Sequence, residues 1–403
     1  MRVVIIGAGI GGLTLAQALR TAGIDAVVHD RDPRADATGG YRLHLDDEAC
    51  TILRRALPPA AYDTLVTHSP HRSAHRGITF ADHRLRTLAT TTFPFAEEML
   101  FVGRVPLRVA LTHGLDDAIR WDSEFVRHET HLDGTVTAHF ADGSTDHGDL
   151  LVGADGATSR VTAALAGRPM SSPIGIGGIA GRTPLAAEIR DLLPHRLRIG
   201  SILAVGPGGT SAFVTMNDAV PALGTPTVVE EPAVYWGVNV PLDRLPHARE
   251  IGADAALRAA GGLLRGWAPA MRAVVSGADP AGVGTFRYHA CDPGAHLTPW
   301  PSGTVTGLGD AVHAMPPTGG RAAATAVRDA NLLATHLADA AKGVTTVPLA
   351  VHEYERGLHA YAPDAVRVSM IPIVWQLRLA NPVMGGLGRL ATAIAAPVAA
   401  LRS

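Results

Sequence analysis

The chain has 403 residues, of which 47% are hydrophobic, and a formal net charge of −2. This length predicts two domains, or one large α/β unit with a second lobe. No basic excess exists to neutralise phosphates, which excludes nucleic acid as an expected partner. The two cysteines, Cys50 and Cys291, are too few for a disulfide framework or a cysteine-based zinc site, and they suit a reducing, cytoplasmic compartment.

The first thirty residues predict a strand, a helix and a second strand. Arg2–Ile6 is a short β-rich run, Gly11–Ala22 has helical spacing, and Asp25–Asp30 is again β-rich. A strand, helix and parallel strand in this order form a βαβ unit, the start of a Rossmann-like sheet.

A glycine-rich turn joins the first strand to the helix. Residues 7–12 read Gly-Ala-Gly-Ile-Gly-Gly and fit the G-x-G-x-x-G pattern, with Gly11 as an additional glycine. In this pattern Gly7 allows the tight turn, Gly9 leaves room for a pyrophosphate, and Gly12 lets the helix pack closely on the sheet. The N–H groups at the start of the helix then attract phosphate charge. Asp30, at the end of the second strand, is placed to accept hydrogen bonds from ribose hydroxyls, so the segment predicts a dinucleotide site.

The middle of the chain predicts further elements of both kinds. Helices are expected over Ala49–Leu57 and Arg104–Ile119, and a small antiparallel meander over Glu124–Val152. A more distinct block, 181–281, contains three strand-like runs. These runs are Ser201–Val205, Ser211–Met216 and Ala233–Val240.

After this block the expected order is a strand over Thr304–Gly307 and a long helix over Gly320–Ala341. We therefore expect a discontinuous dinucleotide domain, 1–180 and 282–345, with an inserted antiparallel substrate domain, 181–281, and C-terminal helices over 346–403. Arginines and prolines interrupt the apolar C-terminal stretch, so membrane contact is not expected.

A second glycine cluster, Gly175–Gly181, imitates the first. No predicted strand precedes it, and Pro184 discourages a helix after it. This pattern predicts a loop or the edge of a sheet, and it leaves the chain without a convincing second dinucleotide fold.

Two later segments indicate that the expected dinucleotide is a flavin. One runs over residues 149–160 and contains Asp155-Gly156; the other runs over 307–320 and contains Gly309-Asp310. With the glycine turn, they stand in the order and spacing of the single-component FAD monooxygenases, and the chain resembles these flavoprotein aromatic hydroxylases over essentially its whole length. The resemblance is closest to short members such as salicylate hydroxylase and the tetracycline-inactivating monooxygenases.

The resemblance implies FAD as the cofactor and a set of residues that contact it. Asp310 would bind a ribityl hydroxyl, and Asp155-Gly156 would lie near the pyrophosphate and shape the approach of nicotinamide. Arg104 would contact the flavin chain, and Arg42 would run beside the flavin, while Arg31 would touch the adenosine side or remain a solvated surface residue. The other implied contacts are Gly309, Pro317, Gly319, Gly320 and Ala322.

The chain departs from the family pattern just after Gly320. Where the family continues with Gly-Ala-Asn, this chain has Ala322-Ala323-Ala324, although Asp329-Ala330 still matches. The missing glycine and asparagine put the affinity for FAD, the mobility of the flavin and the reaction itself in doubt.

The chemistry implied by the resemblance is monooxygenation. FAD would be reduced by NADPH or NADH as a transient reductant, and a flavin C4a-hydroperoxide formed with O2 would transfer one oxygen to an apolar aromatic or polyketide-like molecule, as in secondary metabolism. No general base and no metal site can be named, and His313 is expected to be structural. Candidate substrate-lining residues are Phe213, Met216, Trp236 and Pro316; Tyr235 cannot share a face with Trp236.

Two alternatives stay open at this point. Baeyer–Villiger oxidation or epoxidation would use the same fold. A non-oxygenating or weakly FAD-binding scaffold would explain the alanines at 322 and 324.

Overall fold

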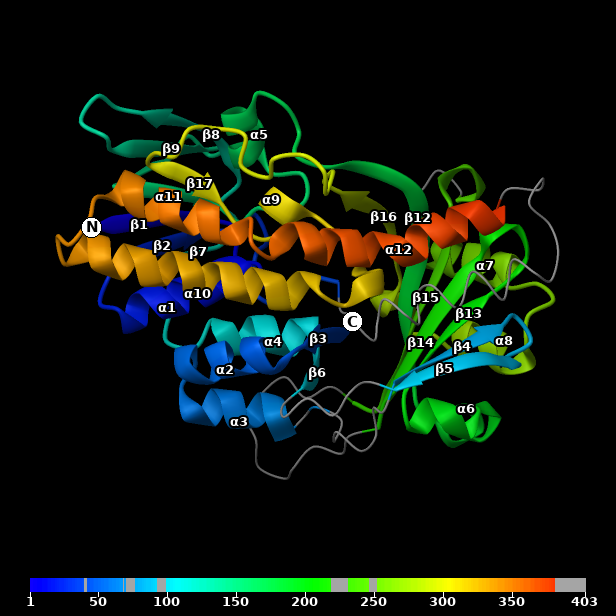
Figure 1. Ribbon diagram of the computed structural model, residues 1–403. Coiled ribbons are helices and arrows are strands. Elements are labelled where there is room, and N and C mark those ends of the chain that lie inside the picture. Colours follow the sequence, from blue (N-terminus) through cyan, green and yellow to red (C-terminus); the bar gives the residue numbers. More distant parts are fainter. Residues whose placement is uncertain are drawn as a thin grey trace.

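A computed structural model of the protein describes residues 1–39, 42–67, 69, 77–92, 99–218, 231–245 and 252–380. It has a mixed α/β architecture with two large sheets on opposite sides of the molecule, and the helix α12 (Ala362–Ala380) runs from the first sheet to the second (Figure 1). The α/β class predicted for the chain is confirmed.

The first sheet has five strands, and every neighbouring pair in it is parallel. In order across the sheet, the strands are β17 (Val305–Gly307), β11 (Leu150–Gly153), β1 (Arg2–Ile6), β2 (Asp25–His29) and β7 (Ile119–Arg120). Almost every residue of β1 and β11 is fully buried, as is typical of a parallel sheet covered on both faces. The predicted first strand is confirmed, and the second ends one residue earlier than predicted.

Helices from both ends of the chain cover one face of this sheet and share its hydrophobic core. The covering helices are α1 (Ile10–Thr21), α2 (Asp47–Ala56), α4 (Arg104–Leu111), α10 (Ala322–Ala341) and α11 (Val347–Leu358), with α3 (Pro59–Thr67) outside α2 and α4. The prediction that α4 runs to Ile119 was wrong. The helix ends at Leu111 because the chain turns at Gly114, whose φ of +71° lies in the left-handed region that favours glycine.

The predicted meander is confirmed as a three-stranded antiparallel sheet on the other face. It consists of β8 (Phe125–Thr130), β9 (Val136–Phe140) and β10 (Thr145–Gly148). The chain then enters β11 of the parallel sheet and forms α5 (Arg160–Ala166). The inner side chains of the three-stranded sheet pack against β1 and β11 and form a separate hydrophobic core with them.

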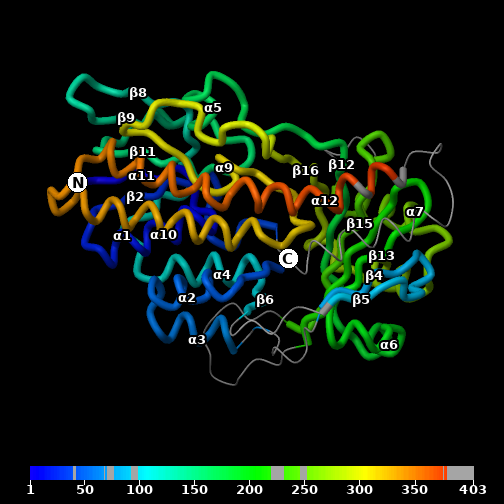
Figure 2. The backbone as a smooth tube through the Cα atoms, in the orientation of Figure 1, coloured from blue at the N-terminus to red at the C-terminus, as the bar shows by residue number. Residues whose placement is uncertain are grey.

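The second large sheet has seven strands. Two come from an early part of the chain, and the other five come from the segment 172–290, which enters the sheet along β12 and leaves it along β16 (Figure 2). Its order is β16 (Gly284–Ala290), β12 (Ser172–Pro184), β15 (Ala233–Pro241), β14 (Ser211–Asn217), β13 (Ser201–Val205), β4 (Gly77–Asp82) and β5 (Thr87–Thr92). The three predicted strands β13, β14 and β15 are confirmed. The sequence did not predict β4 and β5, which come from an early part of the chain.

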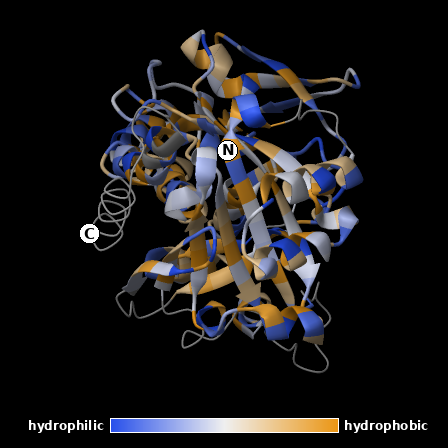
Figure 3. Ribbon diagram, turned by 90° about the vertical axis from the view of Figure 1, so that its right-hand side faces the viewer, coloured by the Kyte–Doolittle hydropathy of each residue, from blue (hydrophilic) through white to orange (hydrophobic). Residues whose placement is uncertain are grey.

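One face of this sheet is covered by α6 (Ala187–Leu192), α7 (Ala253–Leu263) and α8 (Pro269–Ser276), which form a second core with it. The long strands carry hydrophobic stretches (Figure 3). The opposite face is directed toward the first sheet, where a two-stranded ribbon of β3 (Arg42–Leu45) and β6 (Leu100–Gly103) and the helix α12 (Ala362–Ala380) approach it.

The glycine cluster at 175–181 is part of this sheet, so the prediction of a loop or sheet edge was wrong. It lies within β12, which is paired on both sides, by β15 and by β16. Neighbouring rings account for two of its four glycines. A Cβ at Gly178 would come within 2.6 Å of Phe286, and a Cβ at Gly181 within 2.4 Å of Trp236. Glycine in this strand therefore makes room for aromatic side chains from its neighbours.

The described helices include none that is long and apolar enough to span a bilayer. The last segment of the expected C-terminal helices, 381–403, lies outside the described residues.

Candidate functional site

The residues singled out from the sequence meet at one edge of the parallel sheet. Gly7, Asp30 and Asp155 follow β1, β2 and β11, and Asp310 follows β17. These four strands are neighbours and parallel, so their carboxyl ends share an edge. Three motifs that lie as much as 300 residues apart in the sequence are thereby brought side by side.

The glycine turn is shaped by close backbone contacts. Gly7 has a φ of +111°, and a Cβ there would lie 2.3 Å from the Ala154 carbonyl oxygen; a Cβ at Gly12 would lie 2.0 Å from the Gly7 carbonyl oxygen. A Cβ at Gly11 would meet Leu308 at 2.6 Å. Gly9 differs, because among the described residues the one atom within reach of a Cβ is the Ala154 oxygen at 4.0 Å. The chain thus leaves open space at Gly9, directly at the start of α1, where N–H groups attract an anion.

A buried arginine connects this turn to the acid at the end of β2, and sequence reasoning missed it. Arg108 of α4 is 2% exposed; its Nε donates to the Ala8 carbonyl at 2.8 Å, and its guanidinium pairs with Asp30 at 3.2 Å and Asp32 at 2.6 Å. Asp30 also accepts a hydrogen bond from the Ala8 N–H at 2.5 Å. A second arginine one helical turn after Arg104, next to the apolar Leu107 and Leu111, is the sequence feature that could have revealed Arg108.

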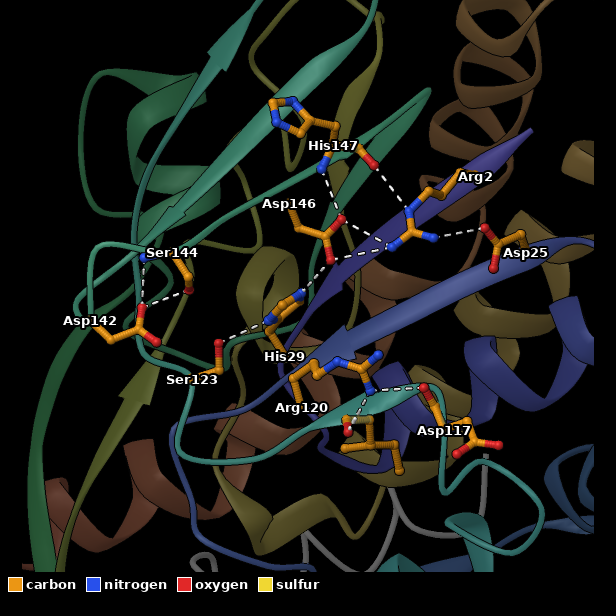
Figure 4. Close-up of polar contacts among 11 residues, drawn as sticks. Arg2, Asp25, His29, Asp117, Arg120, Ser123, Asp142, Ser144, Asp146 and His147 are labelled. Atoms are coloured by element: carbon orange, nitrogen blue, oxygen red, sulfur yellow. Dashed lines mark hydrogen bonds and ion pairs between the residues drawn. The ribbon is translucent and has the colours of Figure 1, made fainter.

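The strand end before Asp30 is anchored to the meander by His29 (Figure 4). His29 Nδ1 lies 2.8 Å from Ser123 Oγ, and Nε2 lies 3.0 Å from Asp146, which also pairs with Arg2 at 3.0 Å. Burial lowers the pKa of His29 even though Asp146 opposes the shift. The order Ser–His–Asp resembles that of hydrolases, but Ser123 and His29 are both buried. This group therefore holds β2, and with it Asp30, in place.

Asp310 combines solvent access with a dense protein environment. Its side chain is exposed, yet protein atoms surround it closely enough that desolvation raises the pKa of its carboxyl, while positive charge from His313 and Arg104 opposes the shift. Arg104 is half-buried at the start of α4. Asp155 is also half-buried; burial raises the pKa of its carboxyl, and Oδ2 accepts the Arg160 N–H at 2.8 Å. Gly156 beside it has a φ of +81°, and Arg31 is exposed next to Asp30.

The end of the 307–320 segment, residues 316–320, is called the closing motif here, and it lies against the β3–β6 ribbon. A Cβ at Gly320, whose φ is +65°, would lie 3.5 Å from His44 of β3, and burial lowers the pKa of His44. Arg42, on the same strand, places its guanidinium 5.8 Å from the ring centre of Tyr235 on the second sheet. The helix α10 begins at Ala322, so the substituted alanines form its first turn. The ribbon, the motif and the second sheet therefore border one region.

The face of the second sheet that borders this region is aromatic and polar. Tyr235 and Asn239 of β15 lie on it, and the Tyr288 hydroxyl donates to Asn239 Oδ1 at 2.9 Å. Phe286 stacks on Tyr288 with ring centres 4.9 Å apart. Phe213, one of the predicted lining residues, is on this face and 37% exposed.

The prediction of Met216 and Trp236 as lining residues is corrected by the alternation of the strands. Both are buried in the core beneath α7 and α8, and Trp236 Nε1 donates to Thr183 at 3.0 Å. A strand points successive side chains to opposite faces, and these two face the helices. Pro316 is buried, whereas Pro317 is exposed.

This arrangement fits a dinucleotide cofactor. The open space at Gly9 and the start of α1 can receive a pyrophosphate, and carboxylates stand on both sides of it, at Asp30 and at Asp310. The residues present therefore fit FAD, with N–H groups for the pyrophosphate and carboxylate acceptors for hydroxyl groups on either side of it along the sheet edge.

Comparisons with known proteins agree. A model of the FAD binding domain matches residues 290–369. The dual O-methyltransferase/FAD-dependent monooxygenase elcB of Phaeosphaeria nodorum is 31% identical over 81% of this chain. The chain spans 39% of the length of that relative. An FAD-dependent urate hydroxylase of Mycolicibacterium vanbaalenii is 28% identical over 82% of this chain and 78% of its own length.

The similarity to one solved structure covers nearly the whole of both chains. It is that of a protein from Photorhabdus luminescens subsp. laumondii assigned as an FAD-containing monooxygenase. It is 31% identical, with a TM-score of 0.77, and the match covers 92% of this chain and 96% of that one. On this shared fold, length and sequence, the chain belongs to the FAD-dependent monooxygenases.

Proposed function

We propose that the protein uses NADPH or NADH and O2 to insert one oxygen atom into an aromatic or polyketide-like small molecule. The observation that carries the proposal is the convergence of the glycine turn, Asp30, Asp155 and Asp310 on one sheet edge, opposite an aromatic and polar sheet face. When bound, FAD supplies the redox chemistry and the activation of O2.

The chain's own residues hold the cofactor in this proposal. The N–H groups at the start of α1 and the space at Gly9 receive the pyrophosphate, and Asp30 accepts from the adenosine ribose. Asp310 accepts from the ribityl chain, with Arg104 and the Asp155-Gly156 turn beside it. The network of Arg108 around Ala8 and Asp30 supports this order, because it fixes the turn and the acid relative to each other.

The substrate is proposed to lie between the closing motif and the second sheet. Phe213 and the stacked pair Phe286–Tyr288 are partly exposed and offer ring faces, which suit a planar substrate, while Tyr235 lies buried beside them under the Arg42 guanidinium. The Asn239–Tyr288 hydrogen bond offers a polar group on the same face, which can orient a hydroxyl or carbonyl. The face supports a ring compound that carries oxygen substituents better than a purely apolar one.

The reductant is proposed to visit without a dinucleotide fold of its own. The glycine cluster at 175–181, which imitates such a fold, lies within an antiparallel strand. NADPH or NADH would then approach the flavin from the Asp155-Gly156 side. The domain limits expected from the sequence are extended in this proposal, with 77–92 and 172–290 forming the substrate lobe, because they supply its sheet.

The test is an oxygen-labelling experiment on protein reconstituted with FAD. Candidate ring compounds are screened for stimulation of NADPH and NADH oxidation under ¹⁸O2, and the product is analysed by mass spectrometry. One ¹⁸O atom per product molecule with an unchanged carbon skeleton is expected for hydroxylation, whereas ring expansion would indicate Baeyer–Villiger oxidation. Protein that takes up no FAD, or oxidises NAD(P)H without labelling any product, would contradict the proposal.

A further inference from the structure

A buried polar cluster lies behind Asp310 and is not used by the cofactor contacts proposed above. Asp329 of α10 and His313 of the short helix α9 (Asp310–His313) have no solvent exposure. Tyr361 joins them from the turn between α11 and α12. A buried carboxylate with several donors is a costly feature unless each donor is well placed.

Asp329 holds both ends of one turn of chain. Its Oδ2 accepts the Gly309 N–H at 2.8 Å and lies 2.5 Å from His313 Nε2. Gly309 immediately precedes Asp310, and His313 is the last residue of α9. The segment that carries Asp310 is therefore fastened at its start and at its end to the same oxygen atom.

The second oxygen is held from outside the turn. The Tyr361 hydroxyl donates to Asp329 Oδ1 at 2.6 Å, and the guanidinium of Arg328 stacks 4.0 Å from the centre of the Tyr361 ring. This contact orients the carboxylate but does not touch the Gly309–His313 turn.

The backbone at Gly309 shows why such fastening matters. Its φ of +61° and ψ of −143° lie in a region that is accessible to glycine and strained for other residues. Glycine has the greatest conformational freedom of any residue, so a hydrogen bond to its N–H removes alternatives that would point Asp310 elsewhere.

His313 is fastened by charge as well as by geometry. Burial works to lower the pKa of His313, but the carboxylates of Asp329 and Asp310 outweigh it and the pKa is raised. Nδ1 is buried without a hydrogen-bond partner among the described residues. The ring therefore depends on Asp329 for its polar contact.

We propose that Asp329 is a positioning residue for the cofactor: it fastens the Gly309–His313 turn at both ends and thereby holds Asp310 in the orientation that meets FAD. The inference rests on the proposed contact between Asp310 and FAD. Asp329 itself is buried and acts through the turn.

The experiment measures the dissociation constant of FAD by titrating deflavinated protein and following the quenching of flavin fluorescence. Asp329→Ala removes the acceptor for both ends of the turn, and we expect FAD affinity to fall about tenfold to 100-fold, since hydrogen bonds to a charged group are lost. Asp329→Asn keeps one acceptor oxygen at the turn and should recover most of the affinity. Tyr361→Phe, the matched control, leaves both ends fastened and should change affinity less than about threefold.

Thermal unfolding of each apoprotein, followed by circular dichroism, separates positioning from folding. Equal FAD affinity in wild type and Asp329→Ala, with Asp310→Ala weakened, would overturn this inference but leave the proposed cofactor site intact. Unchanged affinity in Asp310→Ala would overturn the proposed contact and this inference with it. If Asp329→Ala does not fold, His313→Ala releases only the far end of the turn; weakened FAD binding then supports the proposal and wild-type binding contradicts it.

Discussion

Gly9 is the position where FAD binding and folding can be separated. Its φ of −73° and ψ of −178° are open to alanine, and within the part of the chain that the structure describes a Cβ would meet the Ala154 oxygen alone, at 4.0 Å. We expect Gly9→Ala to change the free energy of unfolding of the apoprotein by no more than about 1 kcal/mol, because a poorer N-cap is offset by a less flexible unfolded chain. The added methyl group enters the space assigned to the pyrophosphate. Overpacking by such a group costs roughly 1–3 kcal/mol, so FAD affinity should fall about 5- to 150-fold.

Neighbouring glycines supply the controls. Gly7→Ala and Gly12→Ala place a Cβ within 2.3 Å and 2.0 Å of carbonyl oxygens, and we expect both to destabilise the apoprotein. No described residue lies within 4 Å of a Cβ at Gly261 on α7, so Gly261→Ala should lower neither the free energy of unfolding nor the affinity for FAD. Urea unfolding of apoprotein and FAD titration measure the two quantities on each variant. Wild-type FAD affinity in Gly9→Ala would refute the assignment of the pyrophosphate to this space.

Four further results are expected. Arg108→Met should lower the free energy of unfolding by about 3–5 kcal/mol in urea titrations, because it leaves carboxylates near the glycine turn without their buried partner; a loss below about 1 kcal/mol would contradict this. His29 has a lowered pKa, so its contribution to stability is present above about pH 6.5 and lost as the pH falls; His29→Gln should flatten the decline between pH 7.5 and 5.5. Tyr235→Ala should raise the KM for substrate, whereas Trp236→Phe should lower the melting temperature with little change in KM. Ala324→Asn should destabilise the protein by roughly 1–3 kcal/mol, since it introduces an amide into a position that is 7% exposed, and an unchanged urea midpoint would speak against that burial.

The start of the parallel sheet and its glycine motif could be predicted from the sequence because the residues that identify them are close together in the chain. An apolar strand, a glycine turn and an acid at the next strand end identify the βαβ unit without any knowledge of the rest of the chain. The position of Asp310 beside this unit followed only from the resemblance to a family, and the register of β11 and β17 agrees with it.

The second sheet was less predictable because its features depend on tertiary neighbours. Gly178 and Gly181 of β12 make room for the rings of Phe286 and Trp236, which lie on other strands, so the cluster looks like a turn when it is considered alone. Alternation showed that Tyr235 and Trp236 face opposite ways, but not which face the helices would cover. Arg108 was missed for the same reason, since its partners lie about 75 to 100 residues away in the sequence.

The fold shows where the two residues that depart from the family pattern, Ala322 and Ala324, lie. Gly320 keeps a left-handed φ of +65°, and α10 starts directly after the motif. About two helical turns further along, Asp329 keeps the contacts to Gly309 and His313 that set the register of α10 against Asp310. Ala324 is packed into the core, so the polar group that the family places at this position is replaced here by an apolar contact. We therefore expect the alanine at 324 to remove one polar contact at the start of α10 while Asp329 keeps its place, so that the proposed hold on the flavin side of FAD depends more heavily on the Asp310 turn and on the buried carboxylate of Asp329.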